Sequence, residues 1–425
     1  MKIMIHRGAN EIGGTCIQLS TENTTILLDL GLSLNKNSIP LEFDTSELDA
    51  VLISHPHQDH YGLIDTIDPT TPIYIGNLAK NLLDATRLFL NDPTKPLYAN
   101  NFQFYDKWQS FNIGDFKITP YLVDHSSVDA YGFLIEADDK RIFYSGDFRG
   151  HGNKSKLFDN IIKNPPPHID LLFMEGTMIE RDNSEFPKES AVQEKIRKVI
   201  EQQRNISFLI SSSQNIDRLV SAYKACVACN KILVIDFYTA WVLEQVKKVS
   251  PGVRAMEWQH IAVLKDGYSS GRQYGVMTKD RNRFGKFMRM VFEHTIAGDE
   301  LHECPSRYLV LGKLHSGRAI QTFVAPEPVS VIYSQWQGYL KCNDSECYGA
   351  ETMNAFKRGS IDGIEYHYAH TSGHATVSDL QSFANALNPK ILVPIHTEFS
   401  AKFTDLFPHM KVLVQPTEFH LTGEA

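Results

Sequence analysis

The stretch from Ala50 to His60 constrains this chain more than any other. An apolar run of the strand type at 50–53 passes through Ser54 directly into His55-Pro56-His57-Gln58-Asp59-His60. Four potential metal ligands therefore lie within six residues at the end of a predicted strand. Histidine nitrogen and carboxylate oxygen together suit zinc, and a strand-end loop can fold several of them around one point. The alternative, a solvated loop that is merely rich in histidine, agrees less well with the further candidates downstream.

Size and composition indicate a folded, enzyme-sized protein. The chain has 425 residues and 42% hydrophobic content, enough for one large core or two medium ones. Arg7 and Gly8 interrupt the N-terminus before a signal sequence could form, and no apolar stretch reaches the length of a membrane span. We therefore expect a cytoplasmic protein without a membrane anchor.

The cysteines are scattered, which favours reduced thiols over a disulfide framework. Cys226 and Cys229 could join Cys342 and Cys347 in a separate zinc site. However, the first two lie in a helical pattern rich in Ala and Val, where small buried thiols are ordinary. The sequence leaves both interpretations open, with the buried thiols favoured.

Charge argues against nucleic-acid binding by the whole surface, because the net charge is −8. One segment, 265–289, has the opposite character, with seven Lys and Arg against Asp266 and Asp280, and with Tyr268, Tyr274, Phe284 and Phe287 interleaved. Cations beside aromatics suit contact with a nucleic-acid backbone and stacking on bases, but they also suit a solvated basic face. The two interpretations stay equally open.

The pattern of apolar residues along the sequence predicts two domains. Short apolar or alternating runs, typical of strands, dominate the first 148 residues, and a helix at 77–90 interrupts them. From about 188 the pattern alternates between helices and buried strands, as in a parallel sheet with crossover helices. The C-terminal part, with a helix at 377–387 and a strand at 391–394, resembles the pattern of the first 148 residues. We therefore predict an α/β sandwich formed by 1–180 and 366–425, with a second α/β domain, 181–365, inserted into it.

Four further polar motifs adjoin apolar runs. They are Asp124-His125, Ser145-Gly146-Asp147, the stretch from His370 to His374, and Pro394-Ile395-His396. If the strands are neighbours, all of these residues project from one edge of the sandwich. A lone His after a strand is usually a satisfied polar residue, but five such features together are not explained in that way.

These residues, in this order, resemble a known family. Asp29, the histidine loop, His125 and Asp147 resemble the first motifs of the metallo-β-lactamase superfamily, and Glu175, His374 and His396 resemble the extra motifs of its β-CASP branch. The stretches Gly8 to Gly13, Asp29-Leu30-Gly31 and Ser372-Gly373-His374-Ala375 are similar to RNase J and to the nuclease subunit of the cleavage and polyadenylation machinery. The resemblance implies an αββα sandwich with an inserted β-CASP domain.

The resemblance also implies a cofactor and roles for particular residues. His55, His57 and His125 would hold one zinc ion, Asp59, His60 and His396 the second, and Asp147 would bridge them. Manganese or magnesium could replace zinc in vitro. A water between the two metals would attack phosphorus in line, so that Asp59 and Asp147 belong to the catalytic set. Asp29 would support the ligand loop from behind.

Other motif residues would act on the substrate. His374 would contact the scissile phosphate or protonate the leaving oxygen, and Glu175 would orient it. His370, Ser372 and Gly373 would cradle phosphate. In the inserted domain, Ser213, Asn215 and Arg218 resemble a polar turn that suits backbone phosphates, although Asn215 is equally explained as a helix N-cap. Trp336 and Tyr339 would form a stacking face or pack in the core. The remaining histidines are not expected to be ligands.

The predicted function is a zinc-dependent ribonuclease acting on single-stranded RNA. His396 favours RNA, because related enzymes that process DNA tend to carry an apolar residue there. The alternatives are a DNA nuclease, a hydrolase of a small phosphodiester or thioester, and a nucleic-acid-binding scaffold without catalysis. The sequence does not separate exonuclease from endonuclease, and it leaves the oligomeric state open, since no segment follows residue 425 that could form the extra C-terminal domain of RNase J.

Overall fold

The computed structural model of the protein describes residues 1–35, 40–41, 43–89, 98, 100–250, 252–253, 257, 259–266, 268–341 and 348–421. The chain forms two compact units. The first contains Met1–Asp84, Pro96–Asn183 and Ser372–Ala425, and the second contains Ala85–Lys95 and Ser184–Thr371. The sequence pattern placed the main boundaries at 180/181 and 365/366, and the units place them at 183/184 and 371/372. It gave no sign of the short segment that begins at Ala85.

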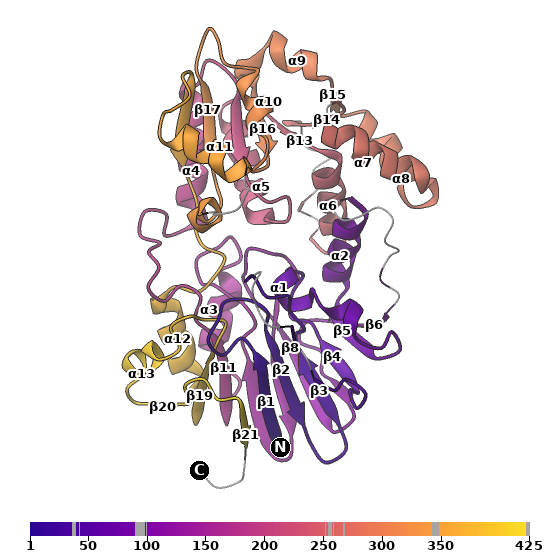
Figure 1. Ribbon diagram of the computed structural model, residues 1–425, viewed down its shortest axis with the longest axis vertical. Coiled ribbons are helices and arrows are strands. Elements are labelled where there is room, and N and C mark those ends of the chain that lie inside the picture. Colours follow the sequence, from indigo (N-terminus) through magenta and orange to yellow (C-terminus); the bar gives the residue numbers. More distant parts are fainter. Residues whose placement is uncertain are drawn as a thin grey trace. The chain divides into compact units, whose positions relative to one another are not determined.

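Two mixed sheets form the first unit (Figure 1). The strands of the first sheet are β1 (Lys2–Arg7), β2 (Cys16–Ser20), β3 (Thr25–Leu28), β4 (Ala50–Leu52), β5 (Pro72–Gly76), β6 (Asn101–Tyr105) and β21 (Glu418–His420). Those of the second are β7 (Phe111–Ile113), β8 (Phe116–Leu122), β9 (Tyr131–Ala137), β10 (Lys140–Tyr144), β11 (Leu171–Glu175), β19 (Ile391–Ile395) and β20 (Lys411–Val412). Their orders are β21-β1-β2-β3-β4-β5-β6 and β20-β19-β11-β10-β9-β8-β7. The C-terminal strands thus complete sheets that the N-terminal part begins.

Alternation along the strands explains why the two sheets stack. Ile26 and Leu28 of β3 face a core that also contains Phe133 and Phe173 of the second sheet. Leu27, between them, points to the opposite face. Because side chains of a strand alternate between faces, strands that are apolar throughout must be covered on both sides. The first unit therefore needs helices outside both sheets.

Helices supply these outer layers. The helices of the first unit are α1 (Gln58–Tyr61), α2 (Asn77–Phe89, which continues into the second unit), α3 (Lys156–Lys163), α12 (Val377–Leu387) and α13 (Lys402–Leu406). Ala79 and Leu83 of α2 pack against the first sheet, whereas Phe383 of α12 packs against Phe143 and Phe148 on the second. The layer order is α, β, β, α, which confirms the predicted fold class.

The second unit is built on a parallel sheet (Figure 1). Its strands are β12 (Ser207–Ile210), β13 (Ile232–Ile235), β14 (Ile261–Leu264), β15 (Thr295–Ile296), β16 (Tyr308–Gly312), β17 (Val329–Tyr333) and β18 (Ile364–Tyr368), in the order β15-β14-β13-β16-β12-β17-β18. Its helices are α4 (Glu189–Gln202), α5 (Ile216–Ala228), α6 (Phe237–Lys247), α7 (Tyr268–Lys279), α8 (Arg281–Phe292), α9 (Gly298–Glu303), α10 (Gly317–Gln321) and α11 (Tyr348–Lys357). Parallel neighbours require such crossover segments between them.

Within the described part of the chain, none of the helices combines the length and the apolar character that crossing a lipid bilayer demands.

Candidate metal centre

The predicted ligands lie at one end of each sheet because the strands that carry them are parallel. In the first sheet β3 and β4 run parallel, so Asp29 and His55 follow strand ends at the same edge. In the second sheet β10, β11 and β19 run parallel, which places Asp147, Glu175 and His396 at a common edge. Loops at the carboxyl ends of parallel strands are where such folds usually bind ligands. The strand order therefore gathers residues that are distant in the sequence.

Nine side chains converge at this edge. Four overlapping groups have ligand atoms within 4.8 Å of one another, and together they contain His55, His57, Asp59, His60, His125, Asp147, Glu175, His374 and His396. His57 Nδ1 lies 3.1 Å from His55 Nε2 and 3.2 Å from His125 Nε2. His396 Nε2 lies 3.2 Å from an Asp59 carboxylate oxygen. An Asp147 oxygen lies 3.2 Å from His60 Nε2 and 3.6 Å from His55 Nε2, so this carboxylate lies between the two histidine sets.

Several of these imidazoles are oriented from behind by a hydrogen bond of Nδ1, whereas His57 turns Nδ1 itself toward His55 and His125. The Nδ1 atoms of His55 and His396 pair with the hydroxyls of Ser54 and Thr177, at 3.0 and 2.9 Å. The Nδ1 of His125 donates to the carbonyl oxygen of Gly373 at 2.7 Å. With Nδ1 occupied, the Nε2 atoms of His55, His125 and His396 face the shared centre, an arrangement that is usual for histidines that bind metals.

Asp29 fixes the histidine loop. It is fully buried and accepts hydrogen bonds from the amide and hydroxyl of Ser54, both at 2.7 Å, from Nδ1 of His60 at 2.7 Å and from the hydroxyl of Tyr144. One carboxylate thus holds the start of the loop and orients His60. Ser54, Tyr144 and Thr177 were not predicted. They lie one to three residues from a predicted site residue, but nothing in the sequence marks them as its hydrogen-bond partners.

The donor set fits divalent cations. Nε2 of His60 and one oxygen of Asp147 are buried, and among the described residues neither has a hydrogen-bond partner of acceptable geometry, although they lie 3.2 Å apart. Buried polar atoms without partners are rare and call for a ligand. Imidazole nitrogens and carboxylate oxygens are the donors that zinc takes in catalytic sites. Their chemistry and their unsatisfied state both match a cation centre.

Protonation states agree with this assignment. Burial lowers the pKa of His55 and His125 well below the usual value and that of His57 to about 4, so these rings stay neutral and keep a free lone pair. Burial would raise the pKa of Asp147, but the charges of His396 and His60 hold it well below its usual range. His60 is the exception: burial lowers its pKa, whereas Asp147 and Asp29 raise it far more. That excess of negative charge is what a cation would neutralise.

His374 reaches the same centre from a different side. It lies just before α12, with Nδ1 3.3 Å from Glu175 and 3.6 Å from Asp147. Burial lowers its pKa, but Glu175 and Asp147 raise it above the usual value on balance. Glu175 is itself buried and accepts the amides of Phe148 and Thr177, so its position is fixed by backbone. His374 therefore lies at the edge of the centre, where the two carboxylates favour its protonated form.

Comparison with known proteins adds the family. A family model described as "Beta-lactamase superfamily domain" matches residues 24–202, and one described as "Zn-dependent metallo-hydrolase RNA specificity domain" matches residues 365–407. The chain belongs to the metallo-β-lactamase superfamily. This confirms the recognition of the family from its motifs, including the β-CASP branch, and with it the prediction of a metal-dependent hydrolase.

Relatives cover nearly the whole of this metallo-β-lactamase chain. Ribonuclease J of Mycoplasma genitalium is 23% identical over 94% of the chain and 68% of its own length. Ribonuclease J 2 of Streptococcus pyogenes is 20% identical over 97% of the chain and 72% of its own length. A crystal structure of a protein of unknown function from Enterococcus faecalis V583 is 19% identical, with a TM-score of 0.74 over 98% of both chains. That likeness shows the fold.

The predicted phosphate-binding residues of the metallo-β-lactamase unit have structural partners. Ser372 is buried, and its carbonyl oxygen accepts bonds from Arg149 at 2.8 Å and His151 at 3.1 Å. Its hydroxyl accepts the amide of His374 at 3.1 Å. Gly373 has no room for a side chain, because a Cβ there would lie 2.5 Å from the Ser126 hydroxyl. Arg149 and His151, which the sequence did not single out for this role, hold the loop in place.

Four other predicted residues belong to the second unit. Asn215 is the N-cap of α5 and accepts the amide of Arg218 at 3.1 Å. Ser213 is buried and bonds to Thr239 and Lys313. His370 pairs with the carbonyl oxygen of Ser334 at 3.3 Å. In these contacts the polar atoms bond to the protein itself, whereas the sequence predicted that they bind phosphates.

Arg218 requires a correction. The sequence pattern predicted a phosphate contact, but the side chain is fully buried and forms an ion pair with Glu189 at 2.8 Å. It also donates to the backbone carbonyl of Ser334 at 2.8 Å. A guanidinium enclosed in this way stabilises the fold and does not reach a solvent-borne phosphate. The physical reason is Glu189, 29 residues earlier, which compensates the buried charge.

The side chains of Trp336 and Tyr339 are 43% and 57% exposed, which excludes the predicted alternative that they pack in the core.

The cysteines that the structure describes show no sign of the second zinc site that the sequence left open. Cys226 is buried within α5 and Cys229 is partly exposed, whereas Cys342 and Cys347 lie outside the described residues. Among the described residues, no cysteine belongs to a possible metal group.

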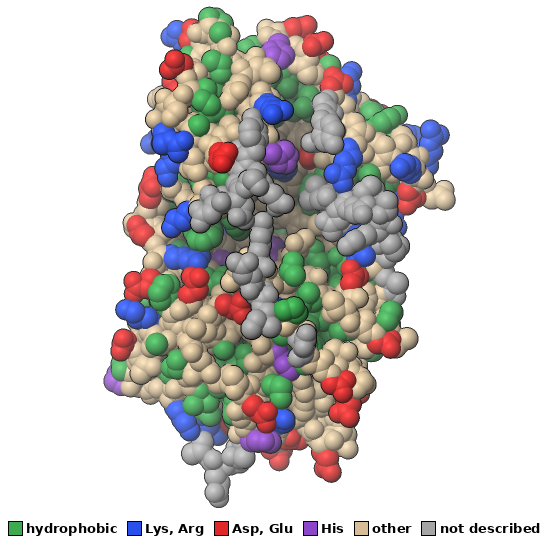
Figure 2. Space-filling model, in the orientation of Figure 1, with side chains coloured by type: hydrophobic (Ala, Val, Ile, Leu, Met, Phe, Trp, Pro, Cys, Tyr) green, Lys and Arg blue, Asp and Glu red, His purple; other side chains and the backbone are tan. Residues whose placement is uncertain are grey.

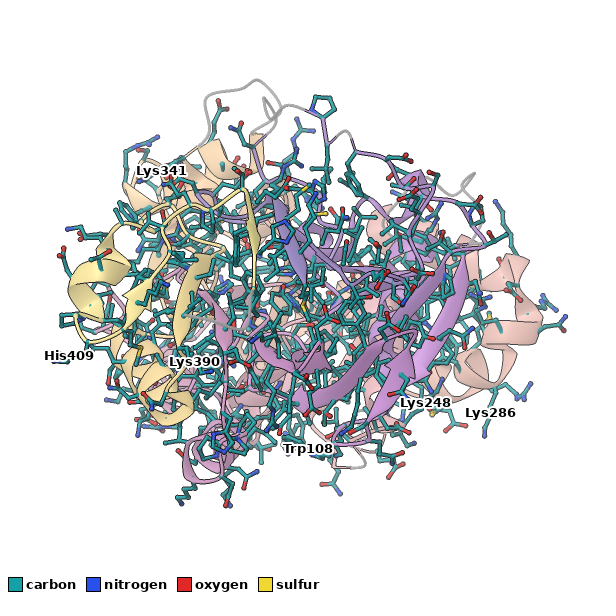
Figure 3. The ribbon with its side chains drawn as sticks, turned by 90° about the horizontal axis from the view of Figure 1, so that it is seen from below. Trp108, Lys248, Lys286, Lys341, Lys390 and His409 are labelled. Atoms are coloured by element: carbon teal, nitrogen blue, oxygen red, sulfur yellow. The ribbon has the colours of Figure 1, made fainter. Side chains whose placement is uncertain are left out.

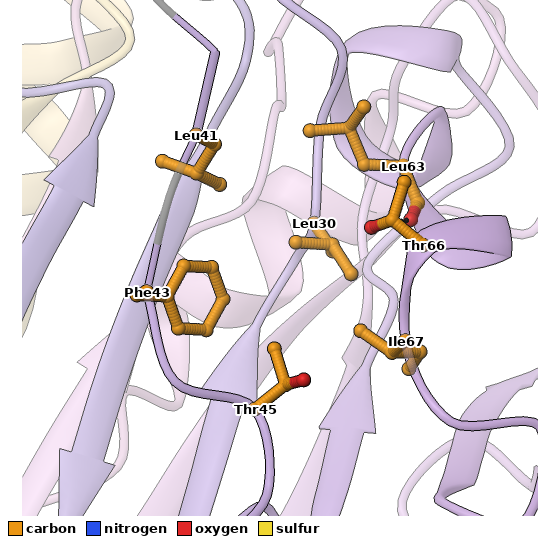
Figure 4. Close-up of a pocket in the computed structure, with 7 residues that line it drawn as sticks. All are labelled: Leu30, Leu41, Phe43, Thr45, Leu63, Thr66 and Ile67. Atoms are coloured by element: carbon orange, nitrogen blue, oxygen red, sulfur yellow. Dashed lines mark hydrogen bonds between the residues drawn. The ribbon is translucent and has the colours of Figure 1, made fainter.

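An apolar cavity of about 420 Å³ lies elsewhere in the first unit (Figure 4). Its described lining consists of Leu30, Leu41, Phe43, Thr45, Leu63, Thr66 and Ile67. The described lining residues offer no acid, base or metal ligand.

Proposed function

We propose that this protein is a ribonuclease that hydrolyses RNA phosphodiester bonds with the help of two bound zinc ions. One observation carries the proposal: the Nε2 atoms of His55 and His60, whose Nδ1 atoms are already bonded, lie 3.6 and 3.2 Å from the buried, unsatisfied oxygen of Asp147. Relatives named Ribonuclease J, similar over 94% of the chain or more, supply the substrate class.

The ligands divide into two sets. His55, His57 and His125 would hold one cation, and Asp59, His60 and His396 the other, with Asp147 between them. When bound, the cations would withdraw charge from the phosphate oxygens and lower the pKa of a water nearby. Manganese or magnesium could substitute in vitro, since carboxylate oxygens also suit them. Asp29 would keep the ring of His60 in the binding orientation.

His374 would act on the phosphate. Its raised pKa favours the protonated imidazole, which can donate a hydrogen bond to a phosphate oxygen or a proton to the departing 3′ oxygen. Glu175, fixed by backbone amides, would keep Nδ1 of His374 oriented and leave Nε2 to do this. Asp147 and Asp59 stay ionised, as carboxylates that hold cations must be.

Single-stranded RNA is the proposed substrate, and a matched test separates it from the alternatives. The protein would be given RNA and DNA oligonucleotides of one sequence, with 5′-phosphate or 5′-hydroxyl ends and a label at either end, with and without a chelator. We expect RNA hydrolysis that the chelator abolishes. A preference for DNA would replace the substrate assignment, and hydrolysis that resists the chelator would refute the cation centre.

The same assay defines the mode of cleavage. Release of mononucleotides from 5′-phosphorylated RNA would indicate a 5′ exonuclease, and internal fragments from both kinds of end would indicate an endonuclease. A protein that binds zinc at both sites yet leaves every polynucleotide intact would instead be a scaffold. A cytoplasmic location and the oligomeric state stay predictions that other measurements must test.

A further inference from the structure

The basic segment identified in the sequence forms a helical hairpin in the second unit. Helices α7 and α8 meet at Asp280, which caps α8 by accepting the amide of Arg283 at 3.1 Å. Segment 265–289 carries seven Lys and Arg and two Asp, a net charge of +5, so that the rest of a chain of net charge −8 carries −13. Positive charge is therefore concentrated in this hairpin.

The hairpin is anchored by its apolar side. Phe284, Phe287 and Val291 of α8 are buried at helical spacing. Phe284 packs against Trp241 and Phe89 with ring centroids 4.7 and 5.5 Å apart, and Phe287 packs against Trp241 at 5.0 Å. Two of the aromatic residues that could have stacked on bases thus belong to the core. Because this face is buried, the polar face of α8 has a defined orientation.

The cations occupy the exposed face. Lys279, Arg281, Lys286 and Arg289 are exposed, and none of them forms a salt bridge with another described residue. Arg283, by contrast, pairs with Asp280 at 3.3 Å. Figure 2 shows Lys and Arg side chains over this hairpin, and Figure 3 shows Lys286 extending away from the ribbon.

A solvated helix face in the same unit looks different. On α4, Arg197 pairs with Glu194 and Glu201 at 2.8 and 2.7 Å, the usual alternation of signs three and four residues apart. From Arg281 to Phe292, α8 has no acidic residue. Cations three residues apart repel each other, and a cation in the first turn opposes the helix dipole. This pattern of cations therefore lowers the stability of α8. A helix face that is only solvated does not need such an unfavourable pattern.

We propose that the exposed cations of the α7–α8 hairpin bind the phosphate backbone of RNA. The proposal rests on the proposed function and adds a binding surface separate from the metal centre. Clustered exposed cations in an otherwise acidic protein favour a polyanion, and a single strand of RNA offers phosphates at each nucleotide. Tyr274, 44% exposed and beside Phe292, adds an aromatic face on which a base can stack.

The test compares two triple variants in a His374→Ala background, which keeps the RNA intact. The hairpin variant is Arg281→Gln, Lys286→Gln and Arg289→Gln. The control is Arg204→Gln, Lys224→Gln and Arg358→Gln, which removes two Arg and one Lys, also exposed, from elsewhere in the same unit. Fluorescence anisotropy with a labelled 20-nucleotide single-stranded RNA gives affinity over a range of salt concentrations, and circular dichroism checks that both variants fold.

We expect the hairpin variant to bind RNA roughly tenfold more weakly, and the slope of log affinity against log salt to fall by about 2, since each phosphate contact on a single strand contributes ~0.7. The control should keep both values. Equal affinities for the two variants, or an equal loss in both, would overturn the proposal. Should the triple variant misfold, Arg289→Gln alone must still lower the slope by about 0.7.

Other partners give different outcomes. If the hairpin variant loses binding to phosphatidylserine vesicles and keeps its affinity for RNA, the surface serves a membrane and the proposal is wrong. If the proposed ribonuclease function is wrong, the unsubstituted protein will not hydrolyse RNA, and this outcome is distinct from any change in the hairpin variant. If the unsubstituted protein hydrolyses RNA but the hairpin variant binds RNA as well as its parent does, the hairpin proposal is wrong and the proposed ribonuclease function stands.

Discussion

The Nδ1 nitrogen of His125 donates a hydrogen bond of 2.7 Å to the carbonyl oxygen of Gly373, 248 residues further along the chain. This bond joins a predicted ligand on the second sheet to the loop that carries His374. Because it fixes the ring of His125, the position of the loop and the binding of a cation depend on each other. The C-terminal segment is thus part of the candidate metal centre as well as of the fold.

Substituting Gly373 tests that dependence. In Gly373→Ala the new Cβ would lie 2.5 Å from Oγ and 2.7 Å from Cβ of Ser126, so rotation of the hydroxyl alone does not relieve the clash. The loop must shift and take the carbonyl away from His125. We expect zinc affinity to fall about 10- to 100-fold, as for other groups that orient a ligand, when measured by competition with a chelating dye.

A second substitution and a control complete this test. Adding Ser126→Gly removes the opposing side chain and should restore most of the zinc affinity. Gly285→Ala is the matched control, because its Cβ meets nothing within 4 Å, and it should leave zinc binding unchanged. Wild-type zinc affinity in Gly373→Ala would show that the Gly373 carbonyl does not position His125.

Asp29 should matter for metal binding without touching the metal. Asp29→Asn keeps the shape but has one acceptor where the carboxylate serves Ser54, His60 and Tyr144. We expect the second cation to bind about 10- to 100-fold more weakly and the protein to lose roughly 1.5–3 kcal/mol of unfolding free energy, since the lost hydrogen bonds involve a charged group. Zinc stoichiometry after dialysis and urea unfolding measure the two effects. The exposed Asp139→Asn should change neither, and two tightly held zinc ions in Asp29→Asn would contradict the role.

Much of the fold could be predicted because apolar periodicity is local. The helix predicted at 377–387 has the bounds that the structure gives it, and the strand predicted at 391–394 lies within β19. The proposed metal ligands could be singled out for a related reason: each belongs to a motif that follows an apolar run, and a polar ligand type at that place has little use in a core. Their order along the chain then matched a known family.

What the sequence did not reveal depends on contacts between distant residues. Tyr144 bonds to Asp29 across 115 residues, and Thr177 bonds to His396 across 219. A tyrosine at the end of an apolar strand gives no local sign of that partner. Arg218 was misread for the same reason, since a cation near a helix N-terminus suggests a phosphate until Glu189 is found beside it. Residues that support others need the folded chain before they can be identified.

His374 should be needed for hydrolysis and not for metal content. His374→Ala removes the protonated ring and leaves the seven proposed ligands intact, so we expect two bound zinc ions and a decrease in kcat of roughly 10²- to 10⁴-fold. Single-turnover hydrolysis of labelled RNA and elemental analysis measure these quantities. The exposed His409→Ala, in the same unit, should keep full activity. Loss of a zinc ion from His374→Ala would make His374 a ligand, which its place beside Asp147 and Glu175 in one possible metal group allows.

Arg218 should prove essential to folding. In Arg218→Ala the carboxylate of Glu189 stays buried without its partner, and breaking such a pair typically costs about 3–5 kcal/mol. Urea unfolding should show this loss, whereas Arg197→Ala, which removes a partly exposed arginine with two glutamate partners, should leave the unfolding midpoint within error. The double variant Arg218→Met with Glu189→Leu should regain much of the stability, because it removes both charges together. If Arg218→Ala were instead as stable as the unsubstituted protein but bound RNA weakly, the phosphate contact first predicted for Arg218 would have to be restored.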